Sequence, residues 1–459
     1  MSNTDIAERR ITMKDFIRAA AHVKPNENQL RLITETPFYA FVHFSPNTYT
    51  GLEWGLGNEP CEIFDPTELD CDQWCEAIKS AGMKGAVITA KHHDGFCLWQ
   101  TAYTEHSIKN SPYKNGKGDI VREFSDACNR HGLKFGFYLS PWDRNSPIYG
   151  TPEYNDYYKA QLTELLTNYG EVFHVWFDGA CGEGPNGKKQ EYDFNGYFEL
   201  IRKYQPNATI FNDRGMIRWC GNEAGQAHHA EWSVVPSELC PFCEVQTGPG
   251  PFSGSLEYMY NSDENIGFIS NIMYSKGLVF APSEVDMSIR DGWFYHADEQ
   301  PHSLERLFNT YLNSVGSNTT FILNIPPMPN GKFDERDVER LHELGEKLKN
   351  EFGTNIAENA GITVTPYCGS DTQTVVEITL DGEHDIHYID FCENIAEGQR
   401  IESFIVQAPD SDGIWRNRAF GTTVGARKIV PLKDLRTDRI RIFVNASRDT
   451  PEFGTFKIY

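Results

Sequence analysis

Two carboxylates in this sequence stand where side chains can carry out nucleophilic and acid–base chemistry. Asp178 directly follows the β-forming run 171–177 and precedes a glycine, and Glu223 lies in the glycine-flanked stretch 221–225. An acid at the C-terminal end of an apolar strand is how α/β barrels present catalytic groups. One carboxylate that attacks and one that transfers a proton are the minimum needed to cleave a glycosidic bond. The pair therefore indicates glycosidase chemistry.

Further polar and aromatic side chains lie at the ends of neighbouring predicted strands. We expect strands at 38–44, 85–91, 134–140, 171–178 and 208–213. Their final or following residues include His43, His92, His93, Tyr138, Trp176 and Asn212-Asp213-Arg214. Because the C-terminal ends of successive barrel strands share one rim, these side chains should converge. Such a mixture suits a sugar, since hydroxyls need hydrogen-bond partners and the ring's C–H face needs aromatic surface.

The elements that must position these groups alternate between strand and helix. Helices are predicted at 69–81, 119–131, 152–169, 194–204, 303–314 and 333–351, and a late strand at 320–325. Alternation of this kind predicts a parallel sheet with right-handed crossovers, here an α/β fold with a (β/α)8-like barrel. Residues 214–300 break the alternation and are rich in Gly, Pro, Trp and His, which is typical of functional loops.

From about residue 355 the pattern changes to a period of two. Short strands are predicted at 362–365, 375–380, 387–391, 404–406 and 440–444, with turns such as Asp381-Gly382 between them. This pattern indicates a C-terminal β-sandwich. A chain of 459 residues is also too long for one ordinary core. We predict a catalytic barrel domain over 1–350, including an N-terminal lead-in, and a β-sandwich domain over 351–459.

Charge and cysteine usage limit the partners. The chain has 42 Lys+Arg against 65 Asp+Glu, a net charge of −23, which disfavours nucleic acid and membrane surfaces. Its 11 cysteines show no repeating spacing, so we expect reduced thiols. Cys240-Pro241-Phe242-Cys243 is a CxxC motif without a second such motif, and incidental loop cysteines are favoured over a zinc or redox site.

The first residues lack the apolar core of a signal peptide, so a cytoplasmic location is expected unless a leader was removed. The sequence does not indicate an oligomeric state.

Six motifs occur in order between about residues 30 and 330. They are Val42-His43-Phe44-Ser45, Glu53-Trp54-Gly55, Lys91-His92-His93-Asp94-Gly95-Phe96, Trp176-Phe177-Asp178-Gly179, Asn212-Asp213-Arg214 and Gly292-Trp293-Phe294-Tyr295-His296. Together they resemble the α-L-fucosidases of glycoside hydrolase family 29. The resemblance implies a retaining exo-glycosidase acting on fucosylated oligosaccharides without a cofactor. Segments 221–223 and 283–290 resemble the branch acting on α-1,3/1,4-linked fucose, although Asp291 stands where we expect proline.

The resemblance also implies a role for each candidate residue. Asp178 would be the nucleophile and Glu223 the acid/base of a double displacement. The side chains implied to hydrogen-bond the fucose hydroxyls are His43, Glu53, His92, His93 and Arg214. Tyr138 would lie beside the nucleophile, and Trp54, Trp176 and Trp293 would shape the sugar pocket.

Two other functions fit parts of the sequence. A single histidine on a strand, such as His43, is usually a hydrogen-bonded core residue. Adjacent His92 and His93 point to opposite sides of a regular strand, so one of them could be structural. With Asp94 they could hold a metal in a metal-dependent barrel hydrolase, although adjacent histidines chelate poorly, and we expect no metal. The other alternative is a catalytically inactive fucose-binding protein, which the presence of both carboxylates disfavours.

Overall fold

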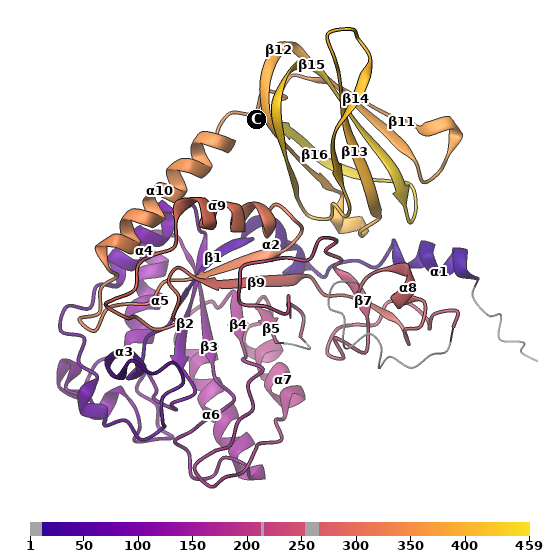
Figure 1. Ribbon diagram of the computed structural model, residues 1–459. Coiled ribbons are helices and arrows are strands. Elements are labelled where there is room, and N and C mark those ends of the chain that lie inside the picture. Colours follow the sequence, from indigo (N-terminus) through magenta and orange to yellow (C-terminus); the bar gives the residue numbers. More distant parts are fainter. Residues whose placement is uncertain (1–11, 213–214, 253–265) are drawn as a thin grey trace, which may run out of the picture.

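An eight-stranded parallel sheet forms the centre of the larger domain (Figure 1). The computed structural model describes residues 12–212, 215–252 and 266–459. The sheet comprises β1 (Phe38–Val42), β2 (Gly85–Lys91), β3 (Lys134–Leu139), β4 (His174–Trp176), β5 (Thr209–Phe211), β6 (Arg218–Trp219), β9 (Ser283–Ser288) and β10 (Thr320–Asn324). Their order is β5-β4-β3-β2-β1-β10-β9-β6. A bridge between Phe211 and Ile217 brings the segment before β6 back to β5. The barrel is therefore nearly closed, and the predicted (β/α)8-like fold is confirmed.

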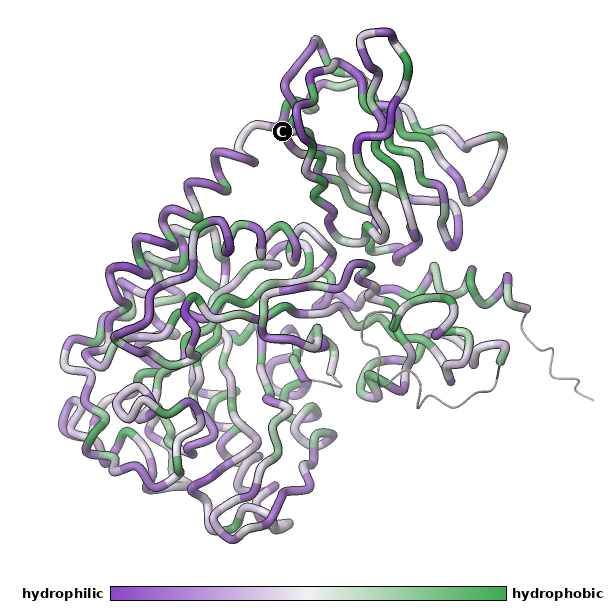
Figure 2. Tube along the Cα trace, in the orientation of Figure 1, coloured by the Kyte–Doolittle hydropathy of each residue, from purple (hydrophilic) through white to green (hydrophobic). Residues whose placement is uncertain are grey.

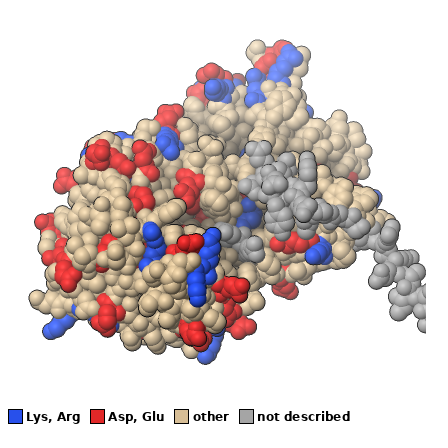
Figure 3. Space-filling view, turned by 60° about the horizontal axis from the view of Figure 1, so that its bottom comes forward, with Lys and Arg blue, Asp and Glu red and all other residues tan. Residues whose placement is uncertain are grey.

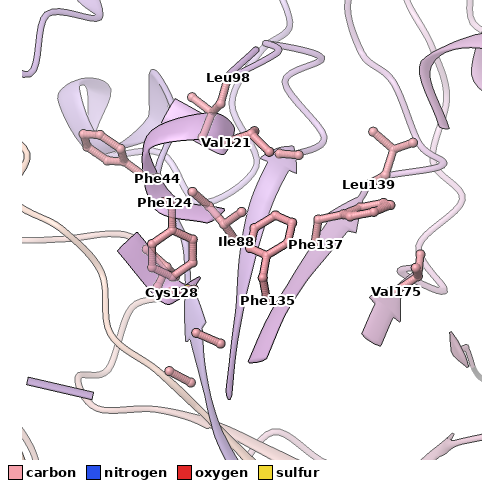
Figure 4. Packing of buried hydrophobic residues seen from close by; sticks show 14 of the residues in the cluster. Phe44, Ile88, Leu98, Val121, Phe124, Cys128, Phe135, Phe137, Leu139 and Val175 are labelled. Carbon is pink, nitrogen blue, oxygen red and sulfur yellow. The ribbon is translucent and has the colours of Figure 1, made fainter. Parts of the chain in front are cut away.

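Helices on the outside of the barrel connect its strands. They are α4 (Cys71–Ser80), α5 (Ile120–His131), α6 (Pro152–Asn168), α7 (Phe194–Tyr204), α9 (Leu304–Asn313) and α10 (Glu335–Phe352). Asp119 shows how they start, since its side chain accepts from the Arg122 backbone N–H and satisfies a donor that the first helical turn leaves unpaired. Phe135 and Phe137 of β3 pack toward Phe124 of α5 in the layer between sheet and helices (Figure 4). This packing holds the C-terminal ends of the strands on one rim.

Aromatic rings fill the inside of the barrel. The Trp176 and Phe211 rings stack with centroids 4.1 Å apart, and Tyr138 stacks on Trp176 at 5.3 Å. Leu32 of α2 (Glu27–Glu35) and Tyr39 belong to the same cluster. Apolar segments accordingly concentrate on the central strands in Figure 2. The barrel interior is a packed core whose upper layer becomes the floor of the site.

The stretch that breaks the alternation contains two barrel strands, β6 and β9, which the sequence analysis did not predict. In β9 the apolar Val285 and Met287 face the outer layer, while Glu284 and Asp286 between them are buried. Acids alternating with apolar residues normally suggest a solvent-facing strand, so this pattern is misleading here. Between β6 and β9 lie β7 (Val234–Pro236), α8 (Ile269–Ile272) and β8 (Leu278–Phe280), and β7 pairs antiparallel with β8.

The C-terminal domain is one antiparallel sheet with a core of its own. Its strands are β11 (Gly361–Pro366), β12 (Thr374–Glu393), β13 (Ile401–Pro409), β14 (Trp415–Gly421), β15 (Lys428–Ser447) and β16 (Phe453–Ile458). The two strands predicted at 375–380 and 387–391 form a single strand, and the turn predicted at Asp381-Gly382 is wrong. The β12–β15 register shifts near these residues, and such bulges bend a long strand without ending it. The predicted C-terminal β-sandwich domain is confirmed as an antiparallel β-domain.

Several short elements make up the remaining regular structure of the described residues. They are α1 (Met13–Ala20), α3 (Asn47–Thr50) and single 3₁₀ turns at Cys61–Ile63, Ile108–Asn110, Tyr113–Gly116, Tyr367–Gly369 and Ile395–Glu397. On the face in Figure 3, acidic and basic side chains of the described residues are interspersed rather than gathered by sign. Within the described ranges, no helix combines the length and apolar composition that a membrane span requires.

Candidate active site

A hollow at the C-terminal rim of the barrel brings the predicted residues together. Twelve residues line it: Phe41, His43, Glu53, Trp54, His92, His93, Tyr138, Trp176, Asp178, Glu223, Asp286 and Trp293. These include every predicted site residue except Arg214, which lies outside the described residues. The hollow holds about 420 Å³ of space, part of it open to solvent. Convergence from separate strand ends is what a parallel barrel produces.

Asp178 sits just beyond β4, and its two carboxylate oxygens have separate partners. Oδ1 accepts from the Ala180 backbone N–H at 2.7 Å, and Oδ2 accepts from the Tyr138 hydroxyl at 3.1 Å. His93 Nε2 lies 3.6 Å from Oδ2. Tyr138 itself is 1% exposed and fixed by its ring stacking. The carboxylate is held at the strand tip with one face toward the hollow, as a nucleophile requires.

Glu223 reaches the same hollow from a tight loop. The Asn222 side-chain oxygen accepts from the Ala224 backbone N–H at 3.1 Å, which folds the loop locally. Gly225 has φ +76°, and a Cβ there would lie 2.8 Å from the Met287 sulfur, so this position requires glycine. Glu223 Oε2 accepts from Trp293 Nε1 at 3.2 Å. The loop thus aims an exposed carboxyl group back across the barrel rim.

Glu53 and the tryptophans form one wall of the hollow. Glu53 Oε2 accepts from the Trp293 backbone N–H at 2.9 Å, and Oε1 lies 2.8 Å from His296 Nε2. His296, which the sequence analysis quoted only as part of a motif, therefore orients Glu53. Trp54 is 61% exposed and meets the edge of Trp142 at 5.8 Å. This exposed ring extends the wall outward, beyond the space that one sugar fills.

The tautomers of two histidines follow from their partners. Asn324 Nδ2 donates to the Trp293 carbonyl, so its Oδ1 accepts from His43 Nδ1 at 2.8 Å. The Ser140 hydroxyl donates to a backbone carbonyl and therefore accepts from His93 Nδ1 at 2.7 Å. Burial lowers the pKa of His43 to about 3 and also lowers the pKa of His93, although the Asp178 charge opposes this shift for His93. Both neutral rings thus keep an Nε2 lone pair that can accept from a ligand hydroxyl.

Asp286 is a fourth carboxyl group in the hollow, beside Glu53, Asp178 and Glu223, and the sequence analysis missed it. It is 3% exposed, and its Oδ1 accepts from Trp219 Nε1 at 3.0 Å. Burial, assisted by the charges of Glu223 and Asp178, raises the pKa of Asp286 to about 8. Glu284, one inward position below on β9, accepts from Trp176 Nε1 at 2.7 Å, and burial raises its pKa well above the usual range. The period-two pattern of residues 283–288 was the available signal for this strand.

The described residues give no support to the metal alternative. No group of three or more His, Cys, Asp or Glu side chains among them is arranged to hold a metal ion. Lys91, which precedes the histidine pair, is fully buried and lies 3.1 Å from Asp143. The Asp94 carboxylate accepts from the Ser45 hydroxyl at 2.6 Å. The residues flanking His92 and His93 are therefore engaged in packing the loop.

Comparison with known proteins identifies the family. A sequence model of the α-L-fucosidases matches residues 34–351. The chain belongs to the α-L-fucosidase family. Alpha-L-fucosidase 1 of Arabidopsis thaliana is 37% identical over 447 residues, covering 91% of this chain and 84% of that protein. The predicted family is confirmed, and the rim hollow belongs to a glycoside hydrolase.

Two solved structures extend the likeness to nearly the whole chain. A crystal structure of a putative alpha-L-fucosidase from Bacteroides ovatus is 40% identical with a TM-score of 0.88, covering 98% of this chain and 76% of that one. A Ruminococcus gnavus GH29 fucosidase, solved in complex with fucose, is 30% identical with a TM-score of 0.80, covering 95% of each chain. The C-terminal sheet domain is therefore shared, and the family is glycoside hydrolase family 29.

Proposed function

We propose that this chain is a retaining exo-glycosidase that releases α-1,3/1,4-linked L-fucose from oligosaccharides or glycoconjugates. The observation that carries the proposal is the presence of Asp178 and Glu223 in one rim hollow with the predicted sugar-binding residues. The fucose complex of the Ruminococcus gnavus relative supports fucose as the sugar that is held. The two alternatives of the sequence analysis, metal-dependent hydrolysis and binding alone, lack an observation in their favour.

The reaction proceeds in two displacements. Asp178 attacks the anomeric carbon while Glu223 protonates the departing glycosidic oxygen, so a carbon–oxygen bond to Asp178 forms as the bond to the leaving group breaks. Glu223 then removes a proton from water, the water oxygen attacks the same carbon, and Asp178 departs as a carboxylate. Two inversions give net retention. The carboxyl groups should approach to about 5–5.5 Å with substrate bound.

Neutral histidines account for recognition of the sugar hydroxyls. The Nε2 lone pair of His93 faces the Asp178 carboxylate at 3.6 Å. Both groups are hydrogen-bond acceptors, so their contact is unfavourable until a sugar hydroxyl lies between them and donates its proton. His43 offers a second acceptor, and Glu53 a carboxylate oriented by His296. Buried acceptors left unpaired are costly, so sugars lacking the matching hydroxyl should bind poorly.

The mechanism can be tested by stereochemistry and by rescue. Proton NMR of an aryl α-L-fucoside reaction at early times should show the α-anomer of fucose first, and initial release of the β-anomer would refute retention. Asp178→Ala should lose nearly all turnover and regain part of it with added azide, yielding fucosyl azide of inverted configuration. If that product appeared only with Glu223→Ala, the two roles would be exchanged. If the unaltered chain bound fucose without turning over any fucoside, the binding-only alternative would replace this proposal.

The linkage preference depends on surface beyond the fucose. Trp54 is 61% exposed. Trp219, whose Nε1 donates to Asp286, is 37% exposed. Exposed rings at a pocket rim suit the C–H face of a leaving sugar. Initial rates on a panel of α-1,2-, 1,3-, 1,4- and 1,6-linked fucosyl oligosaccharides test the proposal. Preference for the 1,3 and 1,4 linkages is expected, and equal rates on all linkages would overturn the branch assignment.

A further inference from the structure

The CxxC segment forms a turn outside the sugar pocket. The Cys243 backbone N–H donates to the Cys240 carbonyl at 3.0 Å, and Pro241 occupies the second position, where proline favours a β-turn. A β-turn keeps its end Cα atoms within about 7 Å, and disulfides join Cα atoms about 4.4–6.8 Å apart. Phe242 packs edge-on against Phe198 of α7 with ring centroids 4.7 Å apart, which anchors the turn. The two cysteines are therefore held at a spacing that a disulfide can close.

The environments of the two sulfurs differ. Cys240 is 1% exposed, and a hydrogen bond from the Cys243 thiol together with the Arg218 charge lowers its pKa. Cys243 is half-buried and lines a hollow of about 590 Å³, part of it open to solvent, with Arg202 on its wall. Cys240 is thus the sulfur favoured as thiolate, and Cys243 beside it lines the hollow that opens to solvent. Both thiols are free in the structure.

A second cysteine pair provides an internal contrast. Cys75 of α4 and Cys128 of α5 also hydrogen-bond to one another. Both are fully buried in the layer between the helices and the sheet. Burial raises the pKa of the Cys128 thiol well above its usual range, and neither sulfur of the pair is accessible to solvent. Of these two pairs, the turn is the one that combines a closable spacing with thiolate character and a sulfur that lines solvent-open space.

We propose that Cys240 and Cys243 form a reversible intrachain disulfide when the protein meets a hydroperoxide. The Cys240 thiolate attacks a peroxide oxygen, the O–O bond breaks, and hydroxide leaves a sulfenic acid on Cys240. The Cys243 sulfur then attacks the Cys240 sulfur, forming the S–S bond while the S–O bond breaks and water departs with the thiol proton. Two thiols are oxidised by two electrons and one hydrogen peroxide is reduced to two waters.

The turn also contacts the loop that follows β5, which gives the disulfide a consequence for the proposed function. The Cys243 sulfur lies 3.3 Å from the Gly215 carbonyl oxygen, to which its single thiol proton donates while Cys240 is protonated. The Gly215 backbone N–H donates to the Asn212 carbonyl at 2.9 Å. Gly215 directly follows Arg214, the predicted fucose ligand outside the described residues. A disulfide has no thiol proton, so oxidation removes this contact. We expect KM for an aryl fucoside to rise about threefold, the effect of one weak hydrogen bond, with kcat little changed.

Thiol counting tests the site without any substrate, so its failure is distinguishable from failure of the proposed function. The reduced full chain is treated with hydrogen peroxide and denatured, and its free thiols are blocked with N-ethylmaleimide. Its intact mass is then measured by mass spectrometry. The untreated chain should bind 11 blocking groups, the number of its cysteines, and the oxidised chain two fewer. Dithiothreitol should restore the two groups. Peptide mapping should place the bond between residues 240 and 243.

Variants distinguish this site from general oxidation. Cys243→Ser should stop at a sulfenic acid on Cys240 that dimedone traps, and Cys368→Ser, which alters an exposed cysteine, should still form the bond. Loss of a different pair, such as Cys75 with Cys128, would overturn the proposal, as would a full set of blockable thiols after oxidation. If the bond forms but KM stays within about twofold of the reduced value, the proposed effect on the β5 loop is overturned.

Discussion

Replacing the buried acid of the rim hollow should stabilise this protein, and the gain should depend on pH. Asp286→Asn keeps the shape of the side chain and an oxygen that can accept from Trp219 Nε1, but it cannot ionise. Burial raises the pKa of Asp286 to about 8 in the folded chain, against about 3.9 for an unfolded aspartate. Glu223 and Asp178 are the charged neighbours that add to this shift.

The sign and size follow from proton linkage. Between pH 4 and pH 8 the folded chain keeps the Asp286 proton while the unfolded chain releases it, so stability falls as pH rises. The free energy of unfolding changes by about 1.36 kcal/mol per pH unit in this range. Between pH 5 and pH 7 the free energy of unfolding of the wild type should therefore fall by up to about 2.7 kcal/mol more than that of the asparagine variant. For a domain of about 350 residues this corresponds to about 3–4 °C in melting temperature.

The assay is a melting curve of both proteins at pH 5, 6 and 7 in one buffer series. The melting temperature of Asp286→Asn should exceed that of the wild type by a margin that grows steadily with pH. Asp298→Asn, at an exposed position, serves as the matched control and should show a constant margin. A margin for Asp286→Asn that stays within about 1 °C of its pH 5 value would refute the reasoning. A variant less stable than the wild type at pH 7 would show that the folded state stabilises the ionised carboxylate.

Three further predictions concern the site and its support. Tyr138→Phe removes the hydroxyl that donates to Asp178 but keeps the stacked ring. It should lower kcat/KM about 10- to 100-fold, the loss expected for a hydrogen bond to a charged group, and an unchanged value would exclude this contact from catalysis. Lys91→Met leaves Asp143 buried without its cation and should destabilise the fold by about 3–5 kcal/mol. Urea unfolding measures this loss of stability, and an unfolding midpoint equal to that of the wild type would contradict the prediction. Dialysis against EDTA should leave fucoside turnover unchanged, and a loss restored by a divalent cation would revive the metal alternative.

Regular parts of the chain could be predicted because local sequence and tertiary structure agree there. The helix at 194–204 was predicted with the bounds it has in the structure, since Asp193 caps it and its apolar residues repeat at helical spacing. Strand β9 could not be predicted in the same way. Its inward-facing acids Glu284 and Asp286 contradict the rule that barrel interiors are apolar. Hydrogen bonds from Trp176 and Tyr39 to Glu284, and from Trp219 to Asp286, make their burial possible.

The sequence by itself determined the barrel, the chemical types at its rim and the pair of acids 178 and 223. These depend on local periodicity and on residue identity, and both can be seen in a linear chain. Only the tertiary structure decided which groups meet and in which protonation state. Asp286 joins the site, His296 orients Glu53, and Cys243 lies against the loop after β5 because segments distant in sequence pack together. Burial, which shifts the pKa of Asp286 and His43, likewise exists only once the chain has folded.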